Sequence, residues 1–197
     1  MSTATYTDIS RDSPAAESET PFSVAKDVIQ LLSQTKSTLG AAESLTAGGL
    51  MSAITSVPGA SAVFRGGVVS YATELKKSLL SVDSDLIARE GVIHGEVAAQ
   101  MAEGARKATS FPGGETTTWG VGTTGVAGPG LQDGKEAGTV YVGISYGGSQ
   151  GSKEGEEGEQ QWSKSVGPFK FKGGREEVRQ QTILEALRAL REAIGGY

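Results

Sequence analysis

The chain contains no cysteine and a single histidine among its 197 residues. The absence of cysteine excludes disulfide bonds, thiolate nucleophiles and zinc sites with thiolate ligands. One histidine, His94, cannot by itself form a usual metal cluster, and its position suits the start of a helix. A hydroxyl nucleophile in this chain therefore depends on another side chain for activation, unless the fold brings His94 to it.

Long apolar runs and clusters of basic residues are also absent. No apolar stretch is long enough to span a membrane and no apolar signal core begins the chain, so we expect a cytoplasmic protein without membrane partners. The net charge of −5 and the lack of a lysine or arginine run argue against a nucleic-acid surface. Hydrophobic residues make up 37% and charged residues 21%, which indicates a globular domain with a core.

Two segments differ from this globular composition. Residues 1–20 are polar and without periodicity, and they predict a disordered tail that ends at Pro21. Residues 147–159 contain five glycines and four glutamates, and they predict a solvated, low-complexity hairpin insertion. We expect the remainder of residues 21–197 to form one domain.

Helical and extended patterns alternate along that domain, which predicts a three-layer α/β fold. Ser23 is the expected N-cap of a first helix with one apolar face. Extended segments are expected at 39–42, 63–71, 119–123, 139–146 and 161–172, and further helices at 50–57, 73–80, 83–90, 95–109 and 175–194.

Two glycine motifs match known signatures but lack the required context. Residues 120–125 match the dinucleotide pattern G-x-G-x-x-G, yet Pro129 and Gly130 follow where a helix should begin. Residues 143–147 match the nucleophile elbow G-x-S-x-G, yet the glycine–glutamate insertion follows and His94 lies upstream. We interpret both as strand segments without a cofactor or catalytic role.

Residues 43–49, with the sequence ESLTAGG, are the most informative stretch. A serine at a strand-to-helix turn can lift its oxygen clear of the sheet, and glycines let a ligand approach the backbone. The helix start also offers free N–H groups to an anion. Ser44 is therefore a candidate nucleophile, and the alternative is that Ser44 or Thr46 is an N-cap.

Without cysteine or a well-placed histidine, the side chain that activates Ser44 is expected to be a lysine with a lowered pKa or a tyrosine. Tyr71 and Lys76 are candidates because they lie at the end of the 63–71 strand and in the helix that follows it. Parallel strands gather such ends at one edge of a sheet, where ligands bind. The alternative for Lys76 is that of a solvated helix residue, which we expect for Lys77.

Several separated motifs occur in one order along the chain. They are AESLTAG at 42–48, VPGAS at 57–61, FRGGVVSY at 64–71 with Lys76, TGVAGP at 124–129, GTVY at 138–141, and GGR at 173–175 with Val178 and Arg179. Together they resemble the CinA C-terminal domain family, the nicotinamide-nucleotide amidases, over residues 23–194.

The resemblance implies a three-layer α/β/α domain with a mixed, mostly parallel sheet, in a homodimer. It implies hydrolysis of the carboxamide of nicotinamide mononucleotide to nicotinate mononucleotide and ammonia, with no cofactor and no metal. The expected partner is this pyridine nucleotide substrate. Many relatives also carry an N-terminal nucleotide-processing domain. The motifs here match only the C-terminal domain, so we expect a stand-alone amidase.

The same resemblance implies roles for individual residues. Ser44 is the nucleophile, Lys76 is its activating partner, and Tyr71 and Thr124 are active-site hydroxyls. Arg175 and Arg179 lie four residues apart on the last helix, and their guanidinium groups suit the substrate's phosphate. The expected substrate-binding residues are Glu43, Thr46, Ala47, Gly48, Gly125, Ala127, Gly128, Arg175 and Arg179.

Three positions depart from the family's pattern. Residues 45–48 read LTAG where many members have CTGG, and Ala47 is expected to fit if its φ is negative. His94 stands where a serine is common. Residues 135–137 read KEA in place of the usual Pro-Val before Gly138, so this loop is expected to sit differently.

Two alternatives to an amidase stay open. One is a non-catalytic nucleotide-binding module of the same fold, which ammonia release from nicotinamide mononucleotide would exclude. The other is a competence- or damage-associated accessory protein, which salt-sensitive DNA binding or a copurifying partner would favour.

Overall fold

The computed structural model describes residues 19–148 and 161–196, so the predicted tail through residue 18 and most of the predicted insertion lie outside the described residues. The helices are α1 (Pro21–Gln34), α2 (Gly49–Thr55), α3 (Thr73–Leu80), α4 (Ser84–Glu90), α5 (Gly95–Ala108) and α6 (Arg175–Gly195). The strands are β1 (Leu39–Glu43), β2 (Phe64–Val69), β3 (Trp119–Gly125), β4 (Thr139–Tyr146) and β5 (Trp162–Lys170).

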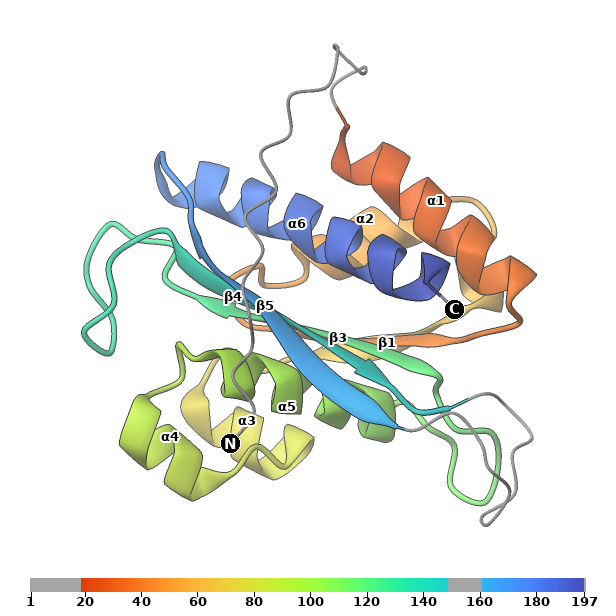
Figure 1. Cartoon of the computed structure of the whole chain (residues 1–197), viewed down its shortest axis with the longest axis horizontal. Helices are drawn as coiled ribbons and strands as arrows, with labels where there is room; N and C mark the ends of the chain where they lie inside the picture. Colours follow the sequence, from red (N-terminus) through yellow and green to blue (C-terminus); the bar gives the residue numbers. More distant parts are fainter. Residues whose placement is uncertain (1–18, 149–160, 197) are drawn as a thin grey trace.

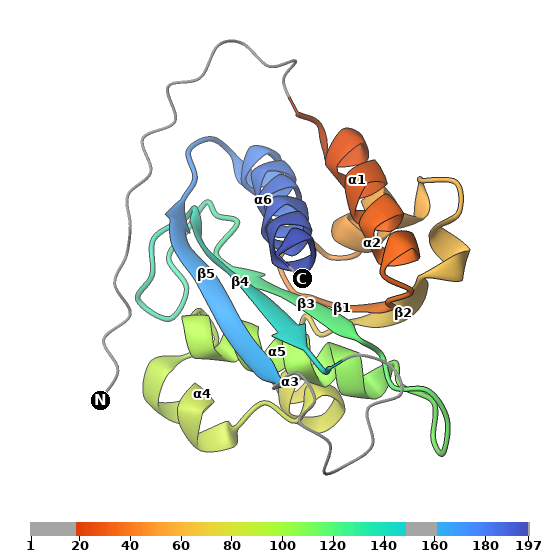
Figure 2. The ribbon, with the colours of Figure 1, turned by 45° about the vertical axis from the view of Figure 1, so that its right-hand side comes forward.

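These elements form the three-layer α/β/α domain that the sequence predicts. Helices α1, α2 and α6 cover one face of the five-stranded sheet, and α3, α4 and α5 cover the other (Figures 1 and 2). Every residue of β3 is buried because helices lie on both of its faces. In the described part of the chain, no helix has the length and apolarity to cross a membrane.

The sheet is mixed, with the strand order β2-β1-β3-β4-β5. Strand β1 pairs in parallel with both β2 and β3, whereas β4 is antiparallel to β3 and to β5. In the register, Glu43 lies opposite both Val69 and Thr123. The segments that follow β1, β2 and β3 therefore leave the sheet at the same edge.

Glycines let α5 pack directly against the sheet. A Cβ added at Gly120 in β3 would overlap the carbonyl oxygen of Ala102 in α5, and one added at Gly143 in β4 would overlap that of Ala98. Gly120, Gly122 and Gly143 are thus glycines because α5 lies so close. This packing confirms the interpretation of both motifs as strand segments.

The start of α1 corrects one expectation. Its N-cap is Thr20, not Ser23: Thr20 Oγ1 accepts a hydrogen bond from Ser23 N at 3.1 Å, and Ser23 Oγ accepts one from Thr20 N at 2.9 Å. This reciprocal pair is a capping box, and Pro21 occupies the first helical position, where its missing N–H has no cost. Pro21 therefore begins the helix.

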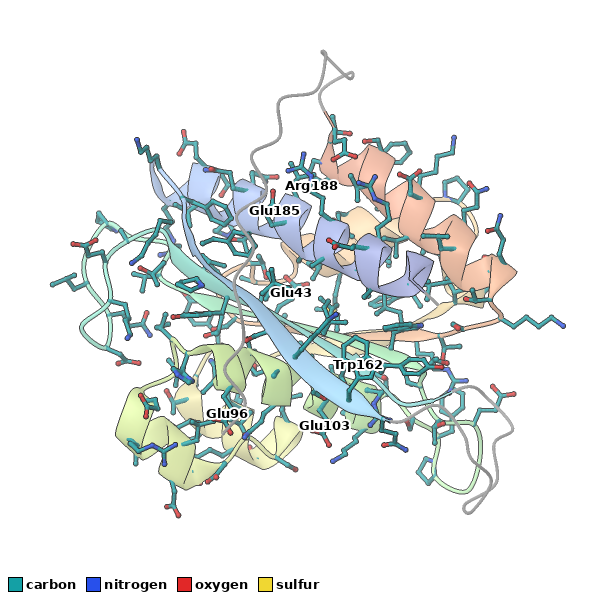
Figure 3. All side chains as sticks on the ribbon, viewed as in Figure 1. Glu43, Glu96, Glu103, Trp162, Glu185 and Arg188 are labelled. Carbon is teal, nitrogen blue, oxygen red and sulfur yellow. The ribbon has the colours of Figure 1, made fainter. Side chains whose placement is uncertain are left out.

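Residue 19 also belongs to the folded part of the chain. The Glu19 carboxylate forms ion pairs with Arg188 at 2.7 Å and with Arg191 at 2.8 Å, and both arginines are on α6. Glu185 and Arg188 lie together on that helix in Figure 3. These contacts fix the entry of α1 beside α6.

We expect Thr20→Ala to lower the free energy of unfolding by about 1 kcal/mol, because it leaves an N–H group at the helix start without an acceptor. Urea denaturation measures this loss. The matched control is Thr35→Ala at the other end of α1, where the hydroxyl bonds back to the carbonyl oxygens of Leu31 and Leu32 in the same helix. Equal losses in the two variants would contradict the capping role.

Candidate active site

The side chains of Ser44 and Lys76 meet beyond the C-terminal ends of the parallel strands β1 and β2. Ser44 directly follows β1, Lys76 lies in α3, and Lys76 Nζ is 3.1 Å from Ser44 Oγ although the residues are 32 positions apart in the sequence. A neutral lysine at this distance can accept the serine proton. The two residues that the sequence analysis paired are therefore within proton-transfer distance.

Lys76 is buried, with 1% of its surface exposed. Its Nζ also donates to the carbonyl oxygen of Ser70 at 2.6 Å, and no ion pair between described residues includes it. Burial lowers the pKa of Lys76 to about 8, and the negative charge of Asp133 opposes this shift. Lys77 is the solvated neighbour, as expected, and pairs with Glu74 at 2.9 Å.

His94 is not an alternative base for Ser44. It is the N-cap of α5, and its Nδ1 accepts a hydrogen bond from Glu96 N at 3.2 Å. None of the hydrogen bonds described for His94 reaches Ser44 or Lys76. The expectation that His94 starts a helix is confirmed.

Glu43 anchors the turn that carries Ser44. Its carboxylate is fully buried near the centre of the molecule (Figure 3) and accepts hydrogen bonds from Gly48 N at 2.8 Å, Leu50 N at 3.2 Å and Met51 N at 2.8 Å. A carboxylate at a helix N-terminus satisfies orphan N–H groups and complements the helix dipole. Glu43 thus holds the turn, and its carboxylate is occupied by these backbone groups.

This arrangement also corrects the N-cap alternative for Ser44 and Thr46. The N-cap of α2 is Gly48, and the caps come from Glu43. Thr46 Oγ1 instead lies 2.9 Å from Thr123 Oγ1, which ties the turn to β3. The hydroxyl of Ser44 is consequently not used as a cap, and it contacts Lys76 Nζ instead.

Thr124 lies deeper than the resemblance implies. Its hydroxyl is fully buried and donates to the carbonyl oxygen of Val92 at 2.7 Å. No hydrogen bond described for it involves Ser44 or Lys76. The structure therefore shows Thr124 tying β3 to the segment before α5.

Some backbone N–H groups of the turn after Ser44 are used within the turn, and others are not. Of the 46–48 backbone, Ala47 N donates to Ser44 O at 3.1 Å and Gly48 N donates to Glu43. The N–H groups of Leu45 and Thr46 have no acceptor among the described residues. Leu45 directly follows Ser44, and in hydrolases with a nucleophilic serine the residue at that position supplies an oxyanion donor.

Ala47 is in the left-handed region, with a φ of +49°. The condition under which the sequence analysis expects Ala47 to fit, a negative φ, is therefore not met. A left-handed conformation costs a residue with a Cβ roughly 1 kcal/mol, whereas glycine adopts it freely. The turn holds Ala47 there because Glu43 and Thr123 fix it on both sides.

The two arginines of α6 have different roles. Arg179 donates to Leu45 O at 3.2 Å and to Thr46 O at 3.0 Å, and it also pairs with Glu176 at 2.7 Å. Its guanidinium is therefore occupied in holding the Ser44 turn. The ion pair with Glu176 joins two residues three positions apart on the same helix.

Arg175 joins the loops at the sheet edge. It is exposed, and it donates to the carbonyl oxygen of Gly128 at 3.0 Å and to the hydroxyl of Tyr71 at 2.7 Å. Both acceptors are neutral, so an anion can compete for this guanidinium. Gly125 and Ala127 support the loop, since Gly125 lies tightly against Thr139 O and Ala127 packs near Leu45.

Two residues of the site carry little signal in the sequence. Ser70 binds Lys76 through its carbonyl oxygen, and a strand-end serine next to Tyr71 is the only hint of it. Asp133 belongs to an exposed Asp-Gly turn, accepts from Val92 N at 2.9 Å, and acts on Lys76 through its charge. The groove between β5 and α6, lined in part by Trp162 and Arg188, contains none of the site residues.

Comparison with known proteins agrees with the motifs. The profile of the CinA C-terminal domain family matches residues 22–194. The chain belongs to this family. A CinA-like protein of Frankia casuarinae is 41% identical over 169 residues, which are 86% of this chain and 34% of that protein. A CinA-like protein of Parasynechococcus marenigrum is 39% identical over 176 residues, which are 89% of this chain and 38% of that protein.

The chain thus spans little more than a third of the length of these curated relatives. Solved structures share the CinA fold. A competence/damage inducible protein of Agrobacterium tumefaciens has a TM-score of 0.73 at 26% identity, covering 89% of this chain and 95% of that chain. A CinA superfamily protein of Klebsiella pneumoniae has a TM-score of 0.75 at 24% identity, covering 91% and 100%.

In this CinA domain we expect Ala47→Gly to raise the free energy of unfolding by up to about 1 kcal/mol, because glycine relieves the left-handed strain. Urea denaturation measures the change. Ala53→Gly in α2 is the control and should lower stability by about 1 kcal/mol, because that alanine is inside a helix. Similar losses in both variants would show that Ala47 is unstrained.

Proposed function

We propose that this CinA domain hydrolyses the carboxamide of nicotinamide mononucleotide to nicotinate mononucleotide and ammonia. The observation that carries the proposal is the 3.1 Å contact between Ser44 Oγ and Nζ of the buried Lys76. A lysine whose neutral form is favoured by burial can activate a serine without histidine. The choice of this amide rests on the family's motifs.

Acylation begins with the transfer of the Ser44 proton to neutral Lys76. The serine oxygen forms a bond to the carboxamide carbon, and the carbonyl oxygen takes up the negative charge. The free N–H groups of Leu45 and Thr46 are the nearest donors for that oxyanion. The Lys76 ammonium then gives its proton to the amide nitrogen, the C–N bond breaks, and ammonia leaves an ester on Ser44.

Deacylation repeats these steps with water. Water attacks the ester carbon and gives a proton to Lys76, which returns it to Ser44 Oγ as the C–O bond breaks. The sum is amide plus water to carboxylic acid plus ammonia, and it requires no oxidant or reductant. The homodimer and the cytoplasmic location expected from the sequence stay predictions.

The substrate's phosphate is assigned to Arg175. Its present acceptors, Tyr71 Oη and Gly128 O, are neutral and can be exchanged for a phosphate oxygen. Arg179 is assigned to holding the turn, because its donors are used by Leu45, Thr46 and Glu176.

We expect Ser44→Ala to reduce ammonia release from nicotinamide mononucleotide by several orders of magnitude, since it removes the nucleophile. Lys76→Arg should be inactive because arginine stays charged. A coupled ammonia assay measures both. The matched controls are Ser52→Ala and Lys77→Arg on neighbouring helices, and turnover at the unmodified rate in Ser44→Ala or Lys76→Arg would refute the mechanism.

The pH dependence follows from the pKa of Lys76. Burial lowers this pKa to about 8, and only the neutral amine can accept the serine proton. We expect kcat/KM to rise about tenfold per pH unit below this pKa and to level above it. A rate that is constant or falling between pH 6 and pH 9 would contradict a lysine base.

We expect nicotinamide riboside, which lacks the phosphate, to be a much poorer substrate than the mononucleotide. Arg175→Ala should narrow this gap by raising KM for the phosphorylated substrate alone. Arg179→Ala is the comparison and should impair both substrates, because it loosens the Ser44 turn. Steady-state kinetics on both substrates decides, and equal rates in the unmodified protein would exclude a phosphate contact.

A further inference from the structure

The hydroxyl of Ser70 has no role in the reaction described above. Ser70 is fully buried, and among the described residues its Oγ is the only buried side-chain nitrogen or oxygen atom without a hydrogen-bond partner. Leaving a buried hydroxyl unpaired is unfavourable, and native proteins contain few such groups. A partner that forms only during the reaction would account for it.

The backbone of Ser70 lies between β1 and Lys76. Its N–H donates to Glu43 O at 2.9 Å, and its carbonyl oxygen accepts from Lys76 Nζ at 2.6 Å. Val68, two residues earlier, packs in the core cluster with Leu80 of α3. Ser70 directly follows β2, and its hydrogen bond to Glu43 O continues the pairing with β1. The alternation of strand residues therefore places Ser70 on the same side of the sheet as the helix that carries Lys76.

The ammonium form of Lys76 needs more acceptors than the neutral form. It has three N–H donors, and the structure supplies two acceptors, Ser44 Oγ and Ser70 O. Once Ser44 is acylated, its Oγ is an ester oxygen and a weak acceptor. A buried ammonium has lost water, so an additional acceptor stabilises it strongly.

We propose that Ser70 is a positioning residue whose hydroxyl accepts a hydrogen bond from the Lys76 ammonium formed during acyl transfer. This inference rests on the proposed function. Rotation about the Cα–Cβ bond re-aims the oxygen of a residue whose carbonyl already touches Nζ. The hydroxyl thereby favours the charged state and partly offsets the effect of burial on the lysine.

Other charged groups around Lys76 do not duplicate this role. The carboxylate of Glu43 is occupied by backbone N–H groups, and Asp133 acts through its charge without a hydrogen bond to the lysine in the described part of the chain. On the adjoining helices, Glu74 pairs with Lys77 and Glu103 pairs with Lys107. Glu96 accepts a hydrogen bond from Gln100, and Arg106 donates one to Ser145. Arg175 donates to Tyr71.

The test is a direct titration of Lys76 by NMR in protein labelled with ¹³Cε-lysine, with the resonance assigned through Lys76→Arg. We expect Ser70→Ala to move the midpoint about one pH unit lower, because the charged form loses an acceptor. Ser70→Thr keeps the hydroxyl and should titrate at the midpoint of the unmodified protein. Ser70→Val has the shape of threonine without the hydroxyl and should titrate like Ser70→Ala. Ser78→Ala, an exposed position of α3, should titrate like the unmodified protein.

Titration of Ser70→Ala and Ser70→Val at the unmodified midpoint would overturn the inference, even if activity fell. Thermal unfolding of each variant identifies a merely structural effect, since removal of an idle buried hydroxyl should leave stability unchanged or higher. The titration needs no substrate. Failure of the proposed function would therefore appear separately, as absence of ammonia release by the unmodified protein.

Discussion

The burial of a lysine amine against a serine hydroxyl is the constraint on which the site depends. Lys76 sits inside the domain with no carboxylate within ion-pairing distance among the described residues, so its charged form is disfavoured there. An ion pair would stabilise the charged form of Lys76, which cannot act as the proposed base. The charge of Asp133 moderates the shift without forming such a pair.

The turn between β1 and α2 places the Ser44 hydroxyl next to that amine. Three side chains from different elements bind this turn. The Glu43 carboxylate accepts from Gly48 N at the start of α2, the Thr123 hydroxyl of β3 bonds to that of Thr46, and Arg179 of α6 donates to Leu45 O. Their combined hold keeps Ala47 in a strained conformation, which is affordable where geometry matters more than local stability. The rigid turn and the buried base thus form one unit.

Local patterns predicted the elements and the reacting pair. Periodicity placed α3 at the residues the structure shows, and the lack of cysteine with a single, distant histidine pointed to Ser44 and Lys76. The roles that were missed depend on contacts between distant segments. The sequence does not reveal that the Glu43 carboxylate binds N–H groups at the start of α2. It also does not reveal that Arg179 donates to a carbonyl oxygen of a turn 133 residues earlier in the chain.

Activation of Ser44 by Lys76 is tested most directly by the rate at which phenylmethanesulfonyl fluoride modifies Ser44 as a function of pH, followed by mass spectrometry of the peptide that contains it. We predict that Ser44 is the serine modified, that the rate rises with a midpoint near the Lys76 pKa of about 8, and that Lys76→Met abolishes the reaction. A rate that is independent of pH or of Lys76, or no modification of Ser44, would contradict activation by this lysine.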